Sequence, residues 1–326
     1  MRRAAIIGTG AFLPEKVLTN ADLEALVDTN NEWIVERTGI CERRVVADED
    51  STSDLAVRAG RTALEDAGLT PNDIDLVIVC TATPDRLIPP TAMTVQSQLG
   101  AERAGSFDLQ SACAGFIYGL SAAGGMIASG MHRRVLLVGA ETLTRFVDYT
   151  DRRTCILFGD AAAAVVLEGR DDGSGLLYSR LYSDGRMADM ICIPAGGSSR
   201  PPTVETLAGR EHYIQVEGRK VFRFATGAFV ELVREALEKC QMTPDDLALV
   251  IPHQMNARII EAAMKRVDVP REKCYMNIDR YGNTSSASIP LALDEARREG
   301  RVGPGDKVLL MGFGAGLTWG ATVVKM

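Results

Sequence analysis

The sequence predicts an α/β protein built from two duplicated halves. The segment ALEDAGLTPNDIDLVIV begins at Ala63 and a similar segment, ALEKCQMTPDDLALVIP, begins at Ala236. In the same way VLLVGAE begins at Val135 and VLLMGFG at Val308, so both pairs are 173 residues apart. Equal spacing in separate segments indicates a duplicated unit. Each unit alternates helices with buried strands of mostly parallel character, and the polar, glycine-containing stretch 169–175 divides the chain into expected halves 1–172 and 173–326.

The elements of the first half follow from apolar periodicity and from turn and cap signals. Asn20 is expected to cap a helix that runs toward residue 30, and Thr52 or Ser53 to cap the next long helix. Residues 32–37 continue as helix or turn, with Trp33 and Arg37 four residues apart on one face. The other predicted helices cover 52–67 and 91–99, and the predicted strands cover 3–8, the segment from Ile74, 106–109, 134–139 and 155–167.

Composition narrows the classes of protein that fit. The 326 residues are 46% hydrophobic and 24% charged, which is ordinary for a soluble globular protein. The net charge of −7 disfavours a general nucleic-acid binder. Seven cysteines without CxxC or zinc-type spacing indicate reduced thiols in a cytoplasmic protein and no metal site. No apolar run approaches the roughly 18 residues of a membrane span, so no membrane partner is expected.

A strand, a tight turn and a helix are predicted around Cys113, in SFDLQSACAGFIYG from residue 106. Small neighbours, Ala112, Ala114 and Gly115, would let a ligand approach the sulfur. Unpaired N–H groups at a helix start stabilise negative charge, so Cys113 is expected to ionise easily and to act as a nucleophile. The alternative is a buried structural cysteine.

The repeat places a histidine and an asparagine opposite this cysteine. Cys80 and His253 end corresponding strands, and Cys113 corresponds to residue 286, three residues after Asn283. If the halves are related by a pseudo-two-fold axis, His253 and Asn283 converge on Cys113 at strand ends, where α/β proteins place their sites. Taken singly, the histidine could be structural and the asparagine a helix cap.

Several segments along the whole chain resemble one known family. They are NADLEALVDTNNEWIVERTGI from Asn20, DLQSACAGFIYGL around Cys113, LFGDAAAAVVL from Leu157, PHQMNARII around His253, DRYGNTSSASIPLALDEA around Asn283 and GFGAGLTWG from Gly312. Together they are similar to β-ketoacyl-(acyl carrier protein) synthase III of the thiolase superfamily. The resemblance implies a thiolase-like, five-layered αβαβα fold and a homodimer.

The resemblance also implies a reaction, the initiating condensation of type II fatty acid synthesis. Cys113 takes the acyl group of an acyl-CoA primer, and malonyl on an acyl carrier protein then loses CO2. His253 and Asn283 donate hydrogen bonds to the enolate, which attacks the acyl-cysteine to give 3-oxoacyl carrier protein. The oxyanion hole would use the backbone N–H of Cys113 and the turn Ala315-Gly316. No cofactor is implied, since acyl-CoA is a substrate.

The same resemblance also implies which residues bind the substrates. Arg219 stands where related sequences often have Asn, and Ile88 stands where acetyl-restricted relatives often have Phe, which implies a pocket for longer or branched primers. The residues implied are Trp33, Arg37, Arg152 and Arg219 for CoA; Gln254, Arg258, Arg223, Lys265 and Arg266 for carrier-protein docking; and Leu87, Ile88 and Phe313 for the acyl pocket. From the residues alone, Trp33 could be half-buried structure, the basic side chains a solvated face, and Ile88 dimer packing.

Two other functions compete with this one. A related condensing enzyme or acyltransferase of secondary metabolism would use the same three residues on other thioesters. HQMNARI and the basic helix after it instead suit a carrier-protein partner. A non-catalytic binding protein of the same fold is disfavoured because Cys113, His253 and Asn283 are all present.

Overall fold

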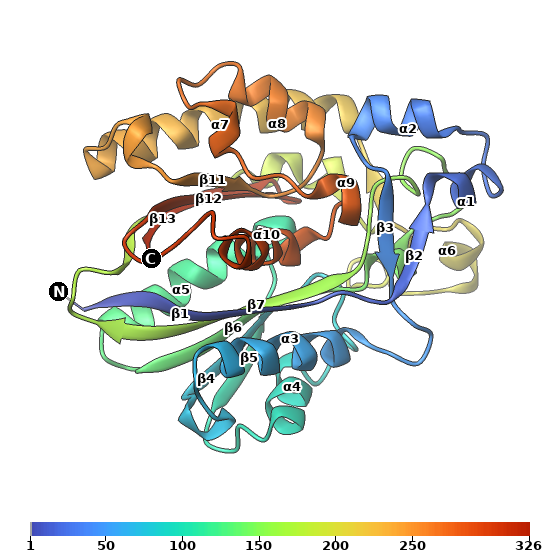
Figure 1. Cartoon of the computed structure of the whole chain (residues 1–326). Coiled ribbons are helices and arrows are strands. Elements are labelled where there is room, and N and C mark those ends of the chain that lie inside the picture. The colour runs from blue at the N-terminus through green and yellow to red at the C-terminus, as the bar shows by residue number, and fades with distance from the viewer. Residues whose placement is uncertain (1) are drawn as a thin grey trace.

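The computed structural model describes residues 2–326 and contains two large β-sheets that face each other (Figure 1). The first has the strand order β1-β7-β6-β4-β5 and the second β11-β12-β13-β8. The strands of the first are β1 (Arg3–Phe12), β4 (Leu76–Cys80), β5 (Gly105–Leu109), β6 (Arg134–Glu141) and β7 (Ala161–Arg170). Those of the second are β8 (Gly175–Ser183), β11 (Leu249–Pro252), β12 (Lys307–Gly314) and β13 (Thr318–Lys325).

The sheets are mixed, so the prediction of mostly parallel strands is wrong. β4 is parallel to β5 and β6, and β11 is parallel to β12. β7 is antiparallel to β1 and β6, while β13 is antiparallel to β12 and β8. The reason is plain for β12 and β13, because residues 315–317 are too few for the crossover that parallel neighbours need.

Three layers of helices enclose the two sheets. α5 (Gly115–Ala128) and α10 (Ser288–Arg298) lie between them, where their apolar side chains share one core with both sheets (Figure 1). α3 (Thr52–Asp66) and α4 (Thr91–Leu99) cover the outer face of the first sheet. α7 (Gly218–Cys240) and α8 (Ala257–Met264) cover the outer face of the second. This confirms the five-layered αβαβα arrangement.

The 173-residue repeat is visible in the elements themselves. The single helical turns η2 (Ala112–Ala114) and η7 (Ser285–Ala287) lie 173 residues apart, and α5 and α10 begin directly after them. Ala112 and Ser285 also share a left-handed backbone, with φ of 45° and 49°. Both helices of the central layer are therefore entered through the same turn.

Capping side chains move several predicted boundaries. Thr19 caps α1 (Asn20–Glu24) by accepting from the N–H of Asp22, and Asn30 caps a separate helix α2 (Asn31–Thr38) by accepting from the N–H of Trp33. The single helix predicted from Asn20 toward residue 30 is therefore wrong. The α3 helix is capped one residue earlier than predicted, at Ser51, whose N–H and hydroxyl donate to Asp54. β1 extends beyond the predicted residue 8, and β7 begins later than the predicted 155.

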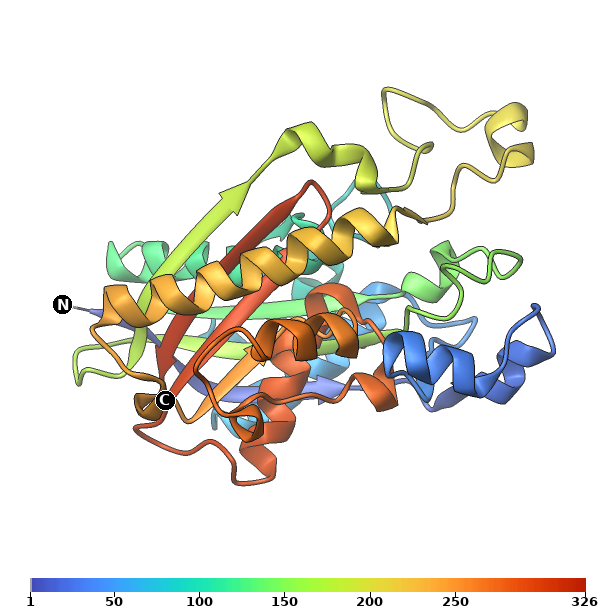
Figure 2. The same ribbon diagram turned by 90° about the horizontal axis from the view of Figure 1, so that it is seen from above.

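Smaller elements gather at one end of the molecule. β2 (Lys16–Thr19) pairs with β3 (Glu42–Val45), and β9 (Ile191–Cys192) pairs with β10 (Gln215–Val216). Figure 2 shows that the segment carrying α6 (Val204–Ala208) extends from the body toward the same end as α1 and α2. Within residues 2–326, no helix has the length and apolarity that a membrane crossing requires.

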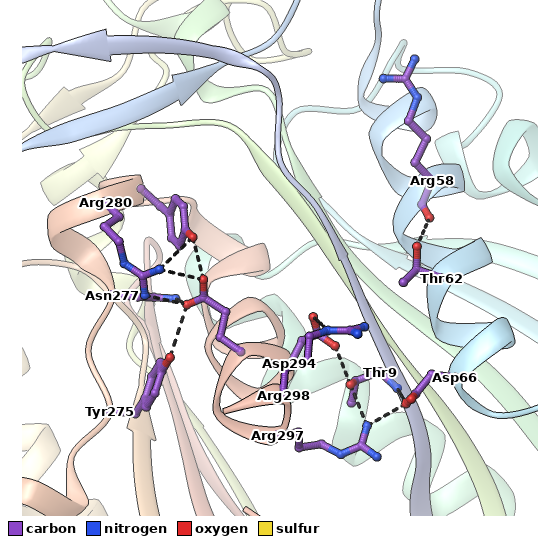
Figure 3. A network of polar contacts seen from close by, with 12 residues as sticks. Thr9, Arg58, Thr62, Asp66, Tyr275, Asn277, Arg280, Asp294, Arg297 and Arg298 are labelled. Carbon is purple, nitrogen blue, oxygen red and sulfur yellow. Dashed lines mark hydrogen bonds and ion pairs between the residues drawn. The ribbon is translucent and has the colours of Figure 1, made fainter. Parts of the chain in front are cut away.

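Polar contacts tie α10 to both halves (Figure 3). Asp294 accepts from the Thr9 hydroxyl at 2.6 Å, and Arg297 donates to Thr9 at 2.7 Å and to Asp66 at 2.9 Å. Toward the second half, the Glu295 carboxylate accepts from Asn277, Arg280 and Tyr281. Because Asp294 and Thr9 are both buried, their hydrogen bond fixes the helix between the sheets. The turn at the start of α10 is held in place with it.

Candidate active site

The two equivalent turns meet at the centre of the molecule. Cys113 lies in η2 and is half-buried, and the hydroxyl of Ser285 in η7 acts to lower the pKa of its thiol. Glycine at 139 allows this meeting, because a Cβ there would lie 2.4 Å from the carbonyl oxygen of Ser286. The close approach therefore lets the turn that follows Asn283 pack against β6, and a Cβ on Gly115, two residues after Cys113, would lie 3.6 Å from the Cβ of Ser286.

Burial opposes the easy ionisation that the sequence predicted for Cys113. Burial raises the pKa of its thiol to about 12, and the negative charge of Glu141 acts in the same direction. The cysteine precedes the first residue of α5, Gly115, and lies in a single turn of 3-10 helix. Desolvation of the thiolate thus outweighs the stabilisation expected at a helix start. The resting group is a thiol, which needs a proton acceptor before it can attack.

His253 follows β11 and is buried as a neutral ring, because burial lowers its pKa to about 3. Its Nδ1 lies 2.6 Å from the hydroxyl oxygen of Ser288, and that oxygen lies 2.8 Å from the carbonyl oxygen of Ser285. Ser288 has one proton to donate. When it donates to Nδ1, the ring proton is on Nε2, which is the arrangement of a hydrogen-bond donor.

Asn283 is buried and held on both its backbone and its side chain. Its Oδ1 accepts from the N–H of Ser285 at 2.8 Å, which leaves the side-chain NH2 as the group available to donate. Its backbone N–H donates to Leu157 at 2.8 Å, and its carbonyl accepts from Gly159 at 3.1 Å. A segment of the first half therefore positions this residue of the second.

The end of β12 packs against the backbone of Cys113. A Cβ on Gly314 would lie 2.9 Å from the backbone nitrogen of Cys113, so only glycine allows this approach. The Thr318 hydroxyl lies 3.2 Å from the carbonyl oxygen of Ser111 and 3.1 Å from that of Ala315. The turn with the predicted oxyanion residues Ala315 and Gly316 therefore follows directly after Gly314, the residue that packs against the backbone of Cys113.

Three of the predicted CoA residues lie together. The Trp33 ring is flanked by two guanidinium groups, with Arg37 at 4.9 Å and Arg152 at 5.3 Å from its centroid. Arg152 also donates to the backbone and carboxylate of Asp28. An aromatic face between two cations can bind a planar base and phosphate groups. Arg219 is exposed in a different segment, the first turn of α7.

Four predicted docking residues are exposed on the outer helix layer, Arg223 on α7 and, on α8 and directly after it, Arg258, Lys265 and Arg266. Gln254 is different, and its assignment to docking is wrong. Its side chain is buried, donates to the carbonyl oxygens of Pro252 and Tyr275, and accepts from the N–H of Asn277. These bonds hold the chain after His253 and make Gln254 a structural residue.

The predicted acyl-pocket residues lie in two environments. Leu87 and Ile88 are 81% and 85% exposed, so they do not line a pocket within their own chain. Phe313 is buried near the end of β12 and stacks on Phe229 at a centroid distance of 6.0 Å. It belongs to the core between the second sheet and α7.

The sequence did not predict the side chains that lie around Cys113, His253 and Asn283. Ser285 and Ser288 stand in NTSSAS without a distinguishing spacing, and Glu141 ends the otherwise apolar VLLVGAE. A single acidic residue at the end of a buried strand is the one signal that pointed to this network. In residues 2–326 there is no group of three or more His, Cys, Asp or Glu side chains arranged to hold a metal ion.

Known proteins match the whole chain. The family pattern of 3-oxoacyl-[acyl-carrier-protein] synthase III covers residues 107–185, and the pattern of its C-terminal part covers 237–326. The chain is 50% identical to beta-ketoacyl-[acyl-carrier-protein] synthase III of Caldanaerobacter subterraneus, over 99% of this chain and 97% of that one. It is 49% identical to the same protein of Desulfitobacterium hafniense DCB-2, over 100% and 98%.

A solved structure agrees with these matches. The synthase III of Aquifex aeolicus VF5 superposes with a TM-score of 0.91 at 44% identity, over 99% of this chain and 100% of that one. Identity near one half over the full length, together with the shared fold, establishes the relationship. The chain belongs to the β-ketoacyl-[acyl-carrier-protein] synthase III family, the acyltransferases that carry out the initiating condensation of fatty acid synthesis.

Proposed function

We propose that this chain condenses an acyl-CoA primer with malonyl-acyl carrier protein, forming 3-oxoacyl carrier protein, CoA and CO2. The observation that carries the proposal is the joining of three side chains at the junction of η2 and η7. Ser285 lowers the pKa of the Cys113 thiol and holds Asn283 through its N–H. Its carbonyl oxygen lies 2.8 Å from the hydroxyl oxygen of Ser288, which in turn lies 2.6 Å from His253 Nδ1.

The chemistry divides into two stages. In the first, the sulfur of Cys113 attacks the thioester carbon and CoA leaves, so the acyl group stays on the enzyme. In the second, His253 Nε2–H and the Asn283 NH2 donate to the thioester oxygen of the malonyl group as CO2 departs. These donors are buried and need no water to reorganise, so they stabilise the enolate strongly. The enolate carbon then attacks the acyl-cysteine.

Substrate binding and assembly complete the proposal. Trp33, Arg37 and Arg152 would hold the adenine and phosphates of CoA. The acidic carrier protein would bind the exposed cations of the outer helix layer, which are Arg223 on α7, Arg258 on α8, and Lys265 and Arg266 directly after α8. Leu87 and Ile88 would be covered by a second subunit, because apolar side chains this exposed favour burial in a homodimer. We further infer a cytoplasmic protein whose halves, 1–172 and 173–326, arose by duplication.

Mass spectrometry of the intact protein mixed with a panel of acyl-CoAs tests the first stage. We expect the wild type to gain one acyl mass, Cys113→Ala to gain none, and the control Cys41→Ala, which removes an exposed free thiol, to load normally. An acylated Cys113→Ala protein would refute the assignment of the nucleophile.

Decarboxylation of a malonyl thioester tests the second stage. His253→Ala and Asn283→Ala should still accept an acyl group on Cys113 but should lose decarboxylation by about 100-fold, the range seen when one such donor is removed. Decarboxylation at the wild-type rate in either variant would show that its side chain does not stabilise the enolate.

A further inference from the structure

A fully buried carboxylate, Glu141, lies against the turn η7, and neither stage above uses it. Glu141 ends β6, and its partners in residues 2–326 are hydroxyl and N–H groups. On one side, Oε1 lies 2.9 Å from the hydroxyl oxygen of Ser285 and 2.8 Å from that of Ser286. On the other side, Oε2 accepts from the hydroxyl of Thr83 at 2.8 Å and from the N–H of Ala82 at 3.1 Å. One carboxylate therefore joins η7 of the second half to the loop after β4 of the first.

The 173-residue repeat gives Glu141 a counterpart. Glu141 ends β6 and Gly314 ends β12, at equivalent positions of the two halves. Gly314 packs on the backbone of η2, since a Cβ there would lie 2.9 Å from the backbone nitrogen of Cys113. Each turn is thus supported by the strand end of the opposite half. The turn η2 is supported by direct backbone packing, and η7 is supported through the Glu141 side chain.

The turn η7 links the two hydrogen-bond donors of the second stage. The N–H of Ser285 donates to Asn283 Oδ1 at 2.8 Å, so the place of Ser285 sets the direction of the amide NH2. The carbonyl oxygen of Ser285 lies 2.8 Å from the hydroxyl oxygen of Ser288, which lies 2.6 Å from His253 Nδ1. Ser285 has a φ of 49°, a backbone conformation that persists only where the surrounding contacts hold it. A shift of η7 would therefore displace the partners of Asn283 and His253 together.

We propose that Glu141 is a positioning residue for decarboxylation, which holds η7 so that Asn283 and His253 both face the malonyl thioester. The inference rests on the proposed function. Glu141 transfers no proton and touches no substrate in this role. A carboxylate suits the role because both of its oxygens accept, and groups that can donate lie on both sides of it.

The cost of burying this carboxylate is offset by the same contacts. A buried charged group is costly unless hydrogen bonds satisfy it. Burial raises the pKa of Glu141, and its hydrogen bonds with the four neighbouring residues act in the opposite direction. The contacts that hold η7 are therefore also contacts that keep the carboxylate in place.

Glu141→Gln tests the proposal, because it keeps the size of the side chain but turns one acceptor into a donor. The N–H of Ala82 needs an acceptor, so the amide oxygen should take the place of Oε2 and the NH2 should face the two serines. In a Cys113→Ala background, kcat for malonyl-CoA decarboxylation should fall by about 10- to 100-fold with KM nearly unchanged, since misplaced donors weaken the transition state. In a protein that keeps Cys113, loading by acetyl-CoA should change by less than about threefold, because Gly314 supports η2.

Thr83→Val is the matched control, since it removes a hydroxyl from the Oε2 side of the same carboxylate. It should lower the free energy of unfolding, because the N–H of Thr142 loses its acceptor. The ratio of decarboxylation to loading should nevertheless stay within about threefold of the wild type.

Ser286→Ala removes a hydroxyl from the Oε1 side and should lower decarboxylation by about tenfold, with loading nearly unchanged. The Ser286 hydroxyl also lies 2.7 Å from the carbonyl oxygen of Cys80, so a double-mutant cycle is needed to isolate its contact with Glu141. The losses of Glu141→Gln and Ser286→Ala should combine to less than their product, because both variants remove the same contact.

Equal losses of loading and decarboxylation in Glu141→Gln would overturn the positioning role, since they would show a carboxylate that only supports the fold. Unchanged decarboxylation in that variant would overturn it as well. If Glu141→Gln does not fold, Ser286→Ala against Thr83→Val decides alone, and equal ratios of decarboxylation to loading for those two would contradict the role. Absence of malonyl-CoA decarboxylation in Cys113→Ala with Glu141 intact would instead refute the proposed second stage, and the positioning role with it.

Discussion

Two glycines of α5 differ sharply in what surrounds them, and this predicts different effects of the same substitution. A Cβ at Gly119 would lie 2.6 Å from Leu137 Cδ1 and 2.7 Å from Cys80 Sγ, both fully buried. A Cβ at Gly125 would meet nothing within 4 Å, and Gly125 is exposed. Alanine in place of glycine stabilises a helix interior by about 1 kcal/mol, and this gain applies to both positions. Overpacking of a core costs about 1–3 kcal/mol, and this cost applies to Gly119 alone.

We therefore expect Gly125→Ala to raise the free energy of unfolding by about 1 kcal/mol. Gly119→Ala should lie about 1–3 kcal/mol below Gly125→Ala. Urea unfolding of both variants and the wild type measures this difference. Because α5 begins directly after the turn of Cys113, Gly119→Ala should also slow acyl loading, while Gly125→Ala should not. Equal stability of the two variants would refute the reasoning, since it would mean that the layer between the sheets has room for a methyl group.

The other predictions concern the partners and the second stage. Arg258→Glu should raise KM for malonyl carrier protein by about tenfold and leave acyl-CoA loading nearly unchanged, because an exposed charge acts mainly on the encounter with the carrier protein. Equal effects on both substrates would contradict a separate docking surface. Acetyl-CoA should not be the sole primer, with butyryl- and isobutyryl-CoA used at comparable or better kcat/KM. Ile88→Phe, which in the proposed homodimer would fill part of the other subunit's acyl pocket, should shift the preference toward acetyl-CoA by about 1–3 kcal/mol of overfilling for the longer acyl groups. A strict acetyl preference, unchanged in the variant, would contradict this. Burial lowers the pKa of His253 to about 3, so the rate of decarboxylation by Cys113→Ala should vary less than about threefold between pH 5.5 and 8. A decline of that rate near the ordinary histidine pKa of about 6.5 would show that the ring becomes charged. Ser288→Ala should slow decarboxylation by about tenfold and loading by much less, as judged by the two assays side by side, because it removes the hydroxyl that lies 2.6 Å from Nδ1 and orients the ring.

The predicted duplication and strand ends indicated where the three main site residues lie in the fold. Cys80 and His253 lie at equivalent strand ends, and Cys113 and Ser286 at equivalent places in the two turns. These positions follow from apolar runs and repeat spacing, which are properties of the chain. The thiol pKa of Cys113 could not be predicted in this way, because it depends on burial by residues distant in sequence. Gln254 likewise looked available for docking, and its burial follows from contacts with residues 275 and 277.

The shared left-handed turn has a consequence for how the two halves divide their work. Ala112 and Ser285 occupy the same backbone conformation, so the difference between the turns lies in their side chains. At the first position, one half has alanine, while the other has serine, which supplies a hydroxyl. At the second position, Cys113 has Ser286 as its counterpart, whose hydroxyl reaches the carbonyl of Cys80. The two turns thus share one backbone conformation, and the asymmetry of the site lies in the side chains that each turn carries.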